Sequence, residues 1–526
     1  MAGRLVVVTG ISGTGVTQSL QKYSAFCRGV PDVPKVVHTV SVEQHIKPKA
    51  QEILQRVQTV GTPSRGEMLQ LPREILAELW RQSFQEAAEE VNGLRKAGRD
   101  VFLTFHACWY HIRSREYVCI CDPEDLKNLG PDLLVTLADD IYDIGDRLSQ
   151  PGQLFYYERL EPPLLDRIFK LLAALQWRAF ETSLSDRLAA AAGCSHFLFA
   201  VKHPLKTLAD LLSREKACLY LSHPITYART AWNAADNELN EDVDRLVGDV
   251  QTLTRALQQQ FVVFEPTAID ELCFRDGDMG KRWPLAGPEQ DLLWTRPPGG
   301  QADWWQMPED KHGELGLVRL LKDEIVRQIS ARDHKLVEQC QALCVFRPFF
   351  KGELAKGVSR ELRYYDLLRS LDMRDRPAQA LHSPTDERYR VVACIEDAMR
   401  NLITEEGLQA PECFPGELHR ELLGMADETL ASLQAGSPAA SIGSRVLDSA
   451  QKHQVAFHNP SKRHSALDPD TRGLIEETKS RLGSLVRDRV SSCYLDELEE
   501  AGSVHVDREE VSASAYAARF SRRYFA

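Results

Sequence analysis

Short apolar runs recur through the N-terminal part of the chain, and longer segments with helical spacing of apolar residues separate them. The short runs are rich in β-branched and aromatic residues and predict strands, whereas the longer segments predict amphipathic helices. Strands that alternate with helices favour βαβ units and a parallel sheet. The predicted strands are Leu5–Thr9, Val36–Val40, Asp100–Phe105, Leu133–Leu137 and His196–Val201, and the main helices are Pro72–Lys96 and Pro162–Ala191.

A second series of strands and helices begins after the charged stretch Ser213–Ala217. Beyond about Ala378 the pattern is helical and polar. The chain therefore predicts an α/β fold with two parallel-sheet domains, at 1–212 and 213–375, and a helical C-terminal region at 376–526. The strands of the second series are Cys218–Ser222, Phe261–Glu265 and Ala342–Arg347, and its helices are Asn237–Gln260, Leu315–Ser330 and Val358–Leu371.

Composition narrows the function classes. A chain of 526 residues is too long for one hydrophobic core. A formal net charge of −12 disfavours nucleic acid or a membrane surface as the main partner. No segment has the apolar length of a membrane span, and the N-terminus lacks the pattern of a secretion signal. The twelve cysteines show no metal-ligand spacing. We expect a cytoplasmic protein with reduced thiols.

A glycine-rich loop follows the first predicted strand and opens a helix. It reads Gly10-Ile-Ser-Gly-Thr-Gly-Val-Thr17 and fits the phosphate-loop pattern GxxxxGK[ST], except that Val16 stands in place of the lysine. Backbone N–H groups and the helix N-terminus of such a loop can still cradle a phosphate. The candidate nucleotide-binding residues are Gly10, Ser12, Gly13, Thr14, Gly15 and Thr17.

Residues 1–210 resemble archaeal-type adenylate kinases and related small nucleotide kinases. The resemblance rests on the loop, on Val101-Phe-Leu-Thr-Phe-His106, on Leu129-Gly-Pro-Asp132 and on Arg147. Thr104 stands where these kinases have an acidic residue. Because both this acid and the loop lysine are missing, we expect a kinase-like domain that senses a nucleotide or only scaffolds. An ATP-like nucleotide with Mg is its implied ligand, and an active kinase with a lysine donated from elsewhere stays an alternative.

Several polar residues lie where the second series predicts strand ends and helix starts. Tyr220 and Ser222-His223 end the first strand, Asp333 lies on the helix before the last strand, and Gly357-Val-Ser359-Arg-Glu361 opens the next helix. Ligands of open α/β sheets bind beyond the carboxyl ends of the strands, so these side chains can converge there.

This order of residues resembles the nucleoside 2-deoxyribosyltransferase family and its nucleotide N-glycosidase relatives, over about residues 216–370. The resemblance implies that Glu361 is the nucleophile at the anomeric carbon. Asp333 would then handle the base or its protonation, and Tyr220 would orient the glutamate or the sugar. Ser222, His223, Arg347, Gly357 and Ser359 are candidate substrate-binding residues.

The expected reaction is cleavage of an N-glycosidic bond, with water as acceptor in hydrolysis or a second base in transfer. The substrate is a nucleoside or nucleotide, and the chemistry needs no cofactor. Such an activity suits nucleotide salvage or a defence effector that depletes nucleotides. The rival hypothesis is a regulatory protein in which both domains bind nucleotides without turnover.

Other features leave alternatives open. Arg347 and Lys351 either hold a 5′-phosphate or are solvated loop cations. The tryptophan-rich segment around Trp283, Trp294, Trp304 and Trp305 is either a lid or an interface. The irregular spacing of His453, His458 and His464 disfavours a metal site. Ser514–Ala526 predicts a helix that docks on the body or on a neighbouring subunit, and we expect a homo-oligomer.

Overall fold

The chain divides into two compact units, each built from two stretches of sequence. The first comprises Met1–Tyr220 and Leu257–Gln341, and the second comprises Leu221–Ala256 and Ala342–Ala526. The computed structural model describes residues 3–29, 37–57, 71–111, 114–119, 121–156, 160–161, 163–225, 228, 237–269, 271, 315–350, 353–382, 384–405, 408–411, 414–455, 457, 469–491, 494–509 and 511–525.

The first sheet lies in the first unit and has the strand order β2-β3-β1-β6-β7, with every neighbouring pair parallel. Its strands coincide with the five N-terminal apolar runs to within a residue or two at either end. A hairpin, β4 (Cys108–His111) and β5 (Glu116–Cys119), follows β3. The strands are β1 (Leu5–Thr9), β2 (Val37–Ser41), β3 (Asp100–Thr104), β6 (Leu133–Ala138) and β7 (Ser195–Ala200).

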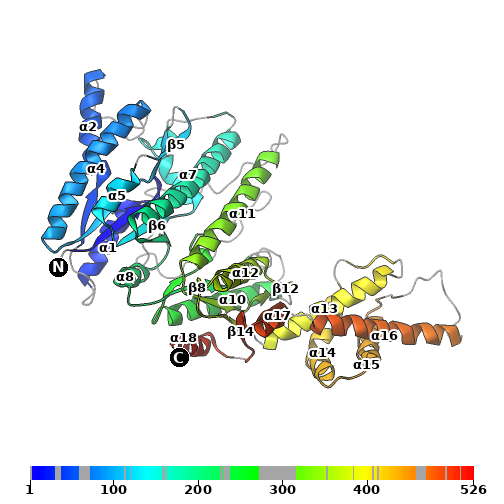
Figure 1. Cartoon of the computed structure of the whole chain (residues 1–526). Coiled ribbons are helices and arrows are strands. Elements are labelled where there is room, and N and C mark those ends of the chain that lie inside the picture. Colours follow the sequence, from blue (N-terminus) through cyan, green and yellow to red (C-terminus); the bar gives the residue numbers. More distant parts are fainter. Residues whose placement is uncertain are drawn as a thin grey trace. The chain divides into compact units, whose positions relative to one another are not determined.

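Two apolar clusters join the helices of this unit to its sheet. The first cluster includes side chains of β1, β3, α2 and α4, and the second joins α6, α7 and α11. Figure 1 shows α11 beside α7, and Leu321 and Ile325 of α11 belong to the second cluster. The helices are α1 (Val16–Gly29), α2 (Val42–Val57), α4 (Arg73–Lys96), α5 (Pro123–Leu129), α6 (Ile141–Leu148), α7 (Pro163–Ala192), α8 (Leu205–Ser213) and α11 (Leu315–Glu338).

The second sheet has the strand order β14-β13-β10-β8-β9, and the pairs β8–β9, β10–β13 and β13–β14 are parallel. The prediction of an α/β fold with two parallel sheets is therefore confirmed. The expectation of helices alone beyond Ala378 is wrong for β13 and β14, which add to the β10 side of this sheet. The strands are β8 (Cys218–Ser222), β9 (Val262–Phe264), β10 (Ala342–Phe346), β13 (Ala378–Leu381) and β14 (Val504–Asp507).

Helices supply the rest of the second unit, together with the short hairpin β11 (Phe349–Phe350) and β12 (Glu353–Leu354). The C-terminal helix α18 lies against the sheet, because Tyr516 is buried with its ring 6.4 Å from that of Phe346 on β10. The helices are α10 (Asn237–Leu257), α12 (Lys356–Ser370), α13 (Pro384–Glu405), α14 (Gly416–Gln434), α15 (Ala439–Lys452), α16 (Pro469–Ser491), α17 (Tyr494–Glu500) and α18 (Ala513–Phe525).

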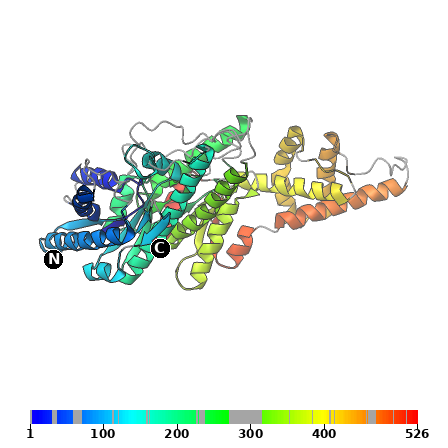
Figure 2. The ribbon, with the colours of Figure 1, turned by 90° about the horizontal axis from the view of Figure 1, so that it is seen from above.

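Helices α13 to α16 share an apolar core of their own, and α13 and α16 run side by side (Figure 2). Helices α15 and α16 approach through two glycines. A Cβ atom on Gly443 would lie 1.8 Å from the carbonyl oxygen of Lys479, and one on Gly483 would lie 1.8 Å from that of Ala439. Only a residue without a side chain allows this backbone contact.

Every cysteine that the structure describes is a free thiol. Within the same described residues, none of the helices combines the length and the apolar character that crossing a membrane requires.

We predict that Gly443→Ala destabilises the helical part of the second unit by about 1–3 kcal/mol, because the added methyl group meets backbone rather than a movable side chain. The matched control is Gly424→Ala on α14, where no atom lies within 4 Å of the added Cβ. That change removes a helical glycine and should be neutral or stabilising, by up to about 1 kcal/mol. Thermal unfolding followed by circular dichroism compares the two, and equal melting temperatures would contradict the close contact.

Candidate functional site

The predicted catalytic carboxylate lies in the second unit. Glu361 is in the second turn of α12 and is buried. Ser222, the last residue of β8, is also buried, and its hydroxyl donates a hydrogen bond to Oε2 of Glu361. The structure thus brings together two of the residues that the sequence singled out, at the carboxyl end of a sheet strand.

The position of this pair follows from the strand order. From β8 the chain passes to β9 on one side and then to β10 on the other, so the order reverses between β8 and β10. In doubly wound sheets, ligands bind outside the carboxyl ends of the strands at such a reversal. The carboxyl end of β8 is therefore the edge where a substrate site is expected, and the Ser222–Glu361 pair lies there.

The remaining predicted binding residues of this unit differ in character. Burial lowers the pKa of His223 to about 3, so its ring is neutral at physiological pH and carries no charge for a phosphate. Gly357 and Ser359 belong to the first turn of α12, where the Ser359 N–H donates to the Ala355 carbonyl at 3.0 Å.

Arg347 follows β10 with a left-handed backbone, at φ 49°. Its guanidinium binds the buried carboxylate of Asp386 through Nη2 at 2.8 Å and Nε at 3.0 Å, and Asp249 lies 3.6 Å away. The positive charge is therefore compensated within the protein, which favours a structural role over phosphate binding. Lys351 and the four tryptophans of the predicted lid lie outside the described residues.

Tyr220 and Asp333 lie in the first unit. Tyr220 is a buried residue of β8, and Asp333 lies on α11. Arg332 donates to Oδ1 of Asp333 from Nη2 at 2.9 Å and from Nε at 3.1 Å. Burial raises the pKa of Asp333, and the neighbouring guanidinium opposes that rise.

The sequence did not single out Glu265, which directly follows β9. This side chain is buried, and burial raises its pKa to about 7 although Thr267 donates a hydrogen bond to Oε2 at 3.3 Å. In the parallel pairing of β8 with β9, Tyr220 is opposite Phe264. Glu265 is therefore a carboxyl group that still holds its proton near neutral pH, as a general acid requires.

The phosphate-loop residues adopt the conformation that their glycines permit. Gly10, Gly13 and Gly15 have φ of 152°, 88° and 80°. A Cβ atom on Gly10 would lie 2.9 Å from the Leu137 carbonyl oxygen, so a larger residue does not fit there. Helix α1 begins at Val16, immediately after the loop, so its first N–H groups point toward the space that the loop encloses.

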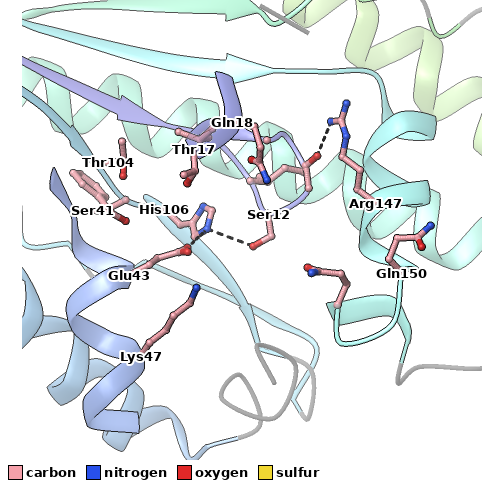
Figure 3. Close-up of a pocket in the computed structure, with 16 residues that line it drawn as sticks. Ser12, Thr17, Gln18, Ser41, Glu43, Lys47, Thr104, His106, Arg147 and Gln150 are labelled. Carbon is pink, nitrogen blue, oxygen red and sulfur yellow. Dashed lines mark hydrogen bonds and ion pairs between the residues drawn. The ribbon is translucent and has the colours of Figure 1, made fainter. Parts of the chain in front are cut away.

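A pocket of about 530 Å³ opens in front of this loop. Figure 3 shows that its walls come from the loop, from α2, from the end of β3 and from α6. Four of the predicted nucleotide-binding residues line it, namely Ser12, Gly13, Gly15 and Thr17. The sequence missed Glu43, Lys47 and Gln150 as members of this site, because they come from elements that carry no motif.

His106, two residues after the end of β3, lines the pocket and contacts both the loop and α2. Its Nδ1 donates to the Gly10 carbonyl, and its Nε2 pairs with the Glu43 carboxylate and lies 3.4 Å from the Ser12 hydroxyl. The ring therefore joins the loop to α2.

Three buried aspartates, Asp139, Asp140 and Asp143, are the one cluster of possible metal ligands found among the described residues. The ammonium group of Lys202 pairs with all three, at 3.0 Å from Asp139 and 2.7 Å from Asp143. Arg147 also binds Asp139, at 2.8 Å. Since the ammonium group of Lys202 already pairs with each of the three carboxylates, the cluster does not fit Mg²⁺.

Comparison with known proteins gives no assignment. No protein-family model matches the chain, and no curated protein matches it. The candidate sites therefore depend on the geometry and chemistry of the residues themselves.

We predict that Lys202→Met destabilises the first unit by about 3–5 kcal/mol at neutral pH, because it leaves buried carboxylates without their cation. Lys206→Met is the matched control, since its 2.6 Å pair with Asp210 leaves the lysine side chain 54% exposed. That control should cost less than about 1 kcal/mol. Chemical unfolding measures both, and a Lys202 variant as stable as the control would show that the buried pairing contributes nothing.

We predict that Glu265→Gln stabilises the first unit above neutral pH but not near pH 4.5. The raised pKa means that the folded state keeps a proton that the unfolded state loses, so wild-type stability falls as pH rises from the unfolded value of 4.5 to about 7. The full loss is on the order of 3 kcal/mol. Unfolding of both proteins between pH 4.5 and 8 tests this, and parallel stability curves would contradict the shifted ionisation.

Proposed function

We propose that the protein cleaves the N-glycosidic bond of a nucleoside or nucleotide, with Glu361 as the nucleophile. The observation that carries this proposal is the buried Glu361 carboxylate, bound by the Ser222 hydroxyl at the carboxyl end of β8. A buried carboxylate that lies far from the carboxyl end of a strand would be explained by a structural role alone. The resemblance to nucleoside 2-deoxyribosyltransferases, which names the same glutamate, supports the proposal independently.

The chemistry follows from the charge that develops when the C1′–N bond breaks. The sugar acquires oxocarbenium character, which an adjacent carboxylate stabilises or traps as a glycosyl ester. The base leaves with the bonding electrons and takes up a proton. Water then attacks C1′ and releases Glu361, or a second base attacks and gives transfer.

Ser222 is expected to act through Glu361. Its hydrogen bond fixes the carboxylate and lowers the charge density on Oε2, so that the other oxygen is directed for attack. Ser222 is therefore a positioning residue in this proposal, and its loss should cost far less than the loss of Glu361.

The alternative is a regulatory protein that binds nucleotides without turnover. The pocket beside the phosphate loop favours it, because that site has a ligand-sized volume and needs no catalytic group. Binding there is compatible with turnover in the second unit, so release of free base is the measurement that decides.

We predict that wild type releases free base from at least one member of a panel of nucleosides and nucleotides, measured by chromatography. Glu361→Gln should lower the rate by at least about a thousandfold, because it removes the nucleophile but keeps the shape of the side chain. Ser222→Ala should lower it by about tenfold, the equivalent of one hydrogen bond to a charged group.

The matched control is Glu417→Gln, an exposed glutamate in the first turn of α14. It makes the same chemical change away from the proposed site and should leave the rate unchanged. Base release that survives Glu361→Gln would move the activity to another group, and no release from any substrate would favour the regulatory alternative.

A further inference from the structure

Helix α2 carries two charged residues into the pocket of the first unit. Glu43 and Lys47 are four residues apart and lie on the same face of the helix. Both line the pocket, and Figure 3 shows the side chain of Lys47 extending from α2 toward the space in front of the loop. Neither residue belongs to the glycine-rich motif, which lies on the other side of the pocket.

The other charged groups of the pocket are already compensated. Arg147 donates to the Gly13 carbonyl at 2.7 Å and to Asp139 at 2.8 Å. Glu43 pairs with His106. Lys47, by contrast, forms no hydrogen bond or ion pair with any residue that the structure describes. Among the described residues that line the pocket, the uncompensated charge is therefore positive, and it is the ammonium group of Lys47.

This ammonium group faces a loop whose backbone can bind an anion. The loop offers backbone N–H groups and the N-terminus of α1, and glycines allow a phosphate to approach closely. Such loops usually carry a lysine at the position of Val16, which here offers no charge. A pocket of about 530 Å³ has the size of a small-molecule site and exceeds what a single phosphate needs.

We propose that this pocket binds a nucleoside polyphosphate, and that Lys47 supplies from α2 the phosphate-facing charge that the loop lacks at Val16. The proposal concerns a ligand site in the first unit and does not depend on glycosidase activity in the second.

Isothermal titration calorimetry of the full chain tests the site. All proteins carry Glu361→Gln, so that nucleotides stay intact during the titration. ATP, ADP, inorganic triphosphate and adenosine are the probes. We expect ATP and ADP to bind more tightly than adenosine, and Lys47→Met to weaken ATP binding by about tenfold, as expected for one charge-assisted contact. The adenosine affinity should not change.

Two further variants separate the effect of the Lys47 charge from effects of net charge and of protein structure. Lys96→Met removes an exposed lysine in the last turn of α4 and should leave ATP binding unchanged. Val16→Lys in the Lys47→Met background returns a lysine to the loop and should recover most of the lost affinity, which a merely structural role of Lys47 would not allow.

Three outcomes would overturn the proposal. The first is ATP binding that is equal in wild type and Lys47→Met. The second is equal weakening by Lys47→Met and Lys96→Met, which would indicate only a general effect of charge. The third is a folded protein that binds neither ATP nor ADP. Absence of base release by wild type, with ATP binding intact, would sink the proposed function and leave this proposal standing, so the two failures are distinguishable.

Discussion

The carboxylate of Glu181, on α7, joins the segments that follow the carboxyl ends of β1 and β3 in the first sheet. It accepts hydrogen bonds from the N–H groups of Gly10 at 3.0 Å, Ala107 at 2.9 Å and Cys108 at 2.7 Å. Gly10 begins the phosphate loop, and the other two residues follow β3, so one side chain joins the loop to the segment after β3. Burial raises the pKa of Glu181, and these donors oppose the rise. Without such an acceptor, three buried N–H groups would be left unsatisfied, each at a cost of about 1–3 kcal/mol.

The same principle of compensation organises the charges further along the first unit. Arg178 binds Glu271 at 2.5 Å and 2.9 Å, and Arg332 lies 3.7 Å from the same glutamate while it binds Asp333. Buried charges are tolerated here because each has a partner of opposite charge, and removal of one partner would leave the other uncompensated. Asp333, which the sequence singled out, and Asp139, which the structure places in an acidic cluster, both illustrate this. Asp333 has a guanidinium beside it, and Asp139 has both Lys202 and Arg147.

The amino-acid pattern predicts the central strands well because each is an apolar run buried by its neighbours, as in β1 and β6, whose residues are almost all buried. Strands β13 and β14 have four residues each, and their sequences AQAL and VHVD are too short to separate from helix by periodicity. They are strands because an existing sheet offers them an edge. The sequence could predict that Ser222 and Glu361 lie close together. Ser222 ends a strand and Glu361 lies near the start of a helix, and ligands of open α/β sheets bind where strands end. Lys47 and Glu265 could not be predicted, because nothing local distinguishes an unpaired lysine or a buried acid from an ordinary one.

Each proposed site lies at the carboxyl ends of parallel strands, one in each sheet, and the two sites offer a ligand different chemical groups. In the first unit the groups offered to a ligand are mainly backbone N–H donors, which keep their polarity at every pH, and Lys47 is the side chain proposed to add a positive charge to them. In the second unit the group offered is a carboxylate side chain, whose reactivity depends on staying ionised while buried. The hydroxyl of Ser222 donates a hydrogen bond to this carboxylate and holds it at the carboxyl end of β8. Loss of the Lys47 charge should therefore weaken polyphosphate binding without abolishing it, because the loop remains. Loss of the Ser222 hydroxyl should likewise slow the proposed reaction without abolishing it, because Glu361 remains.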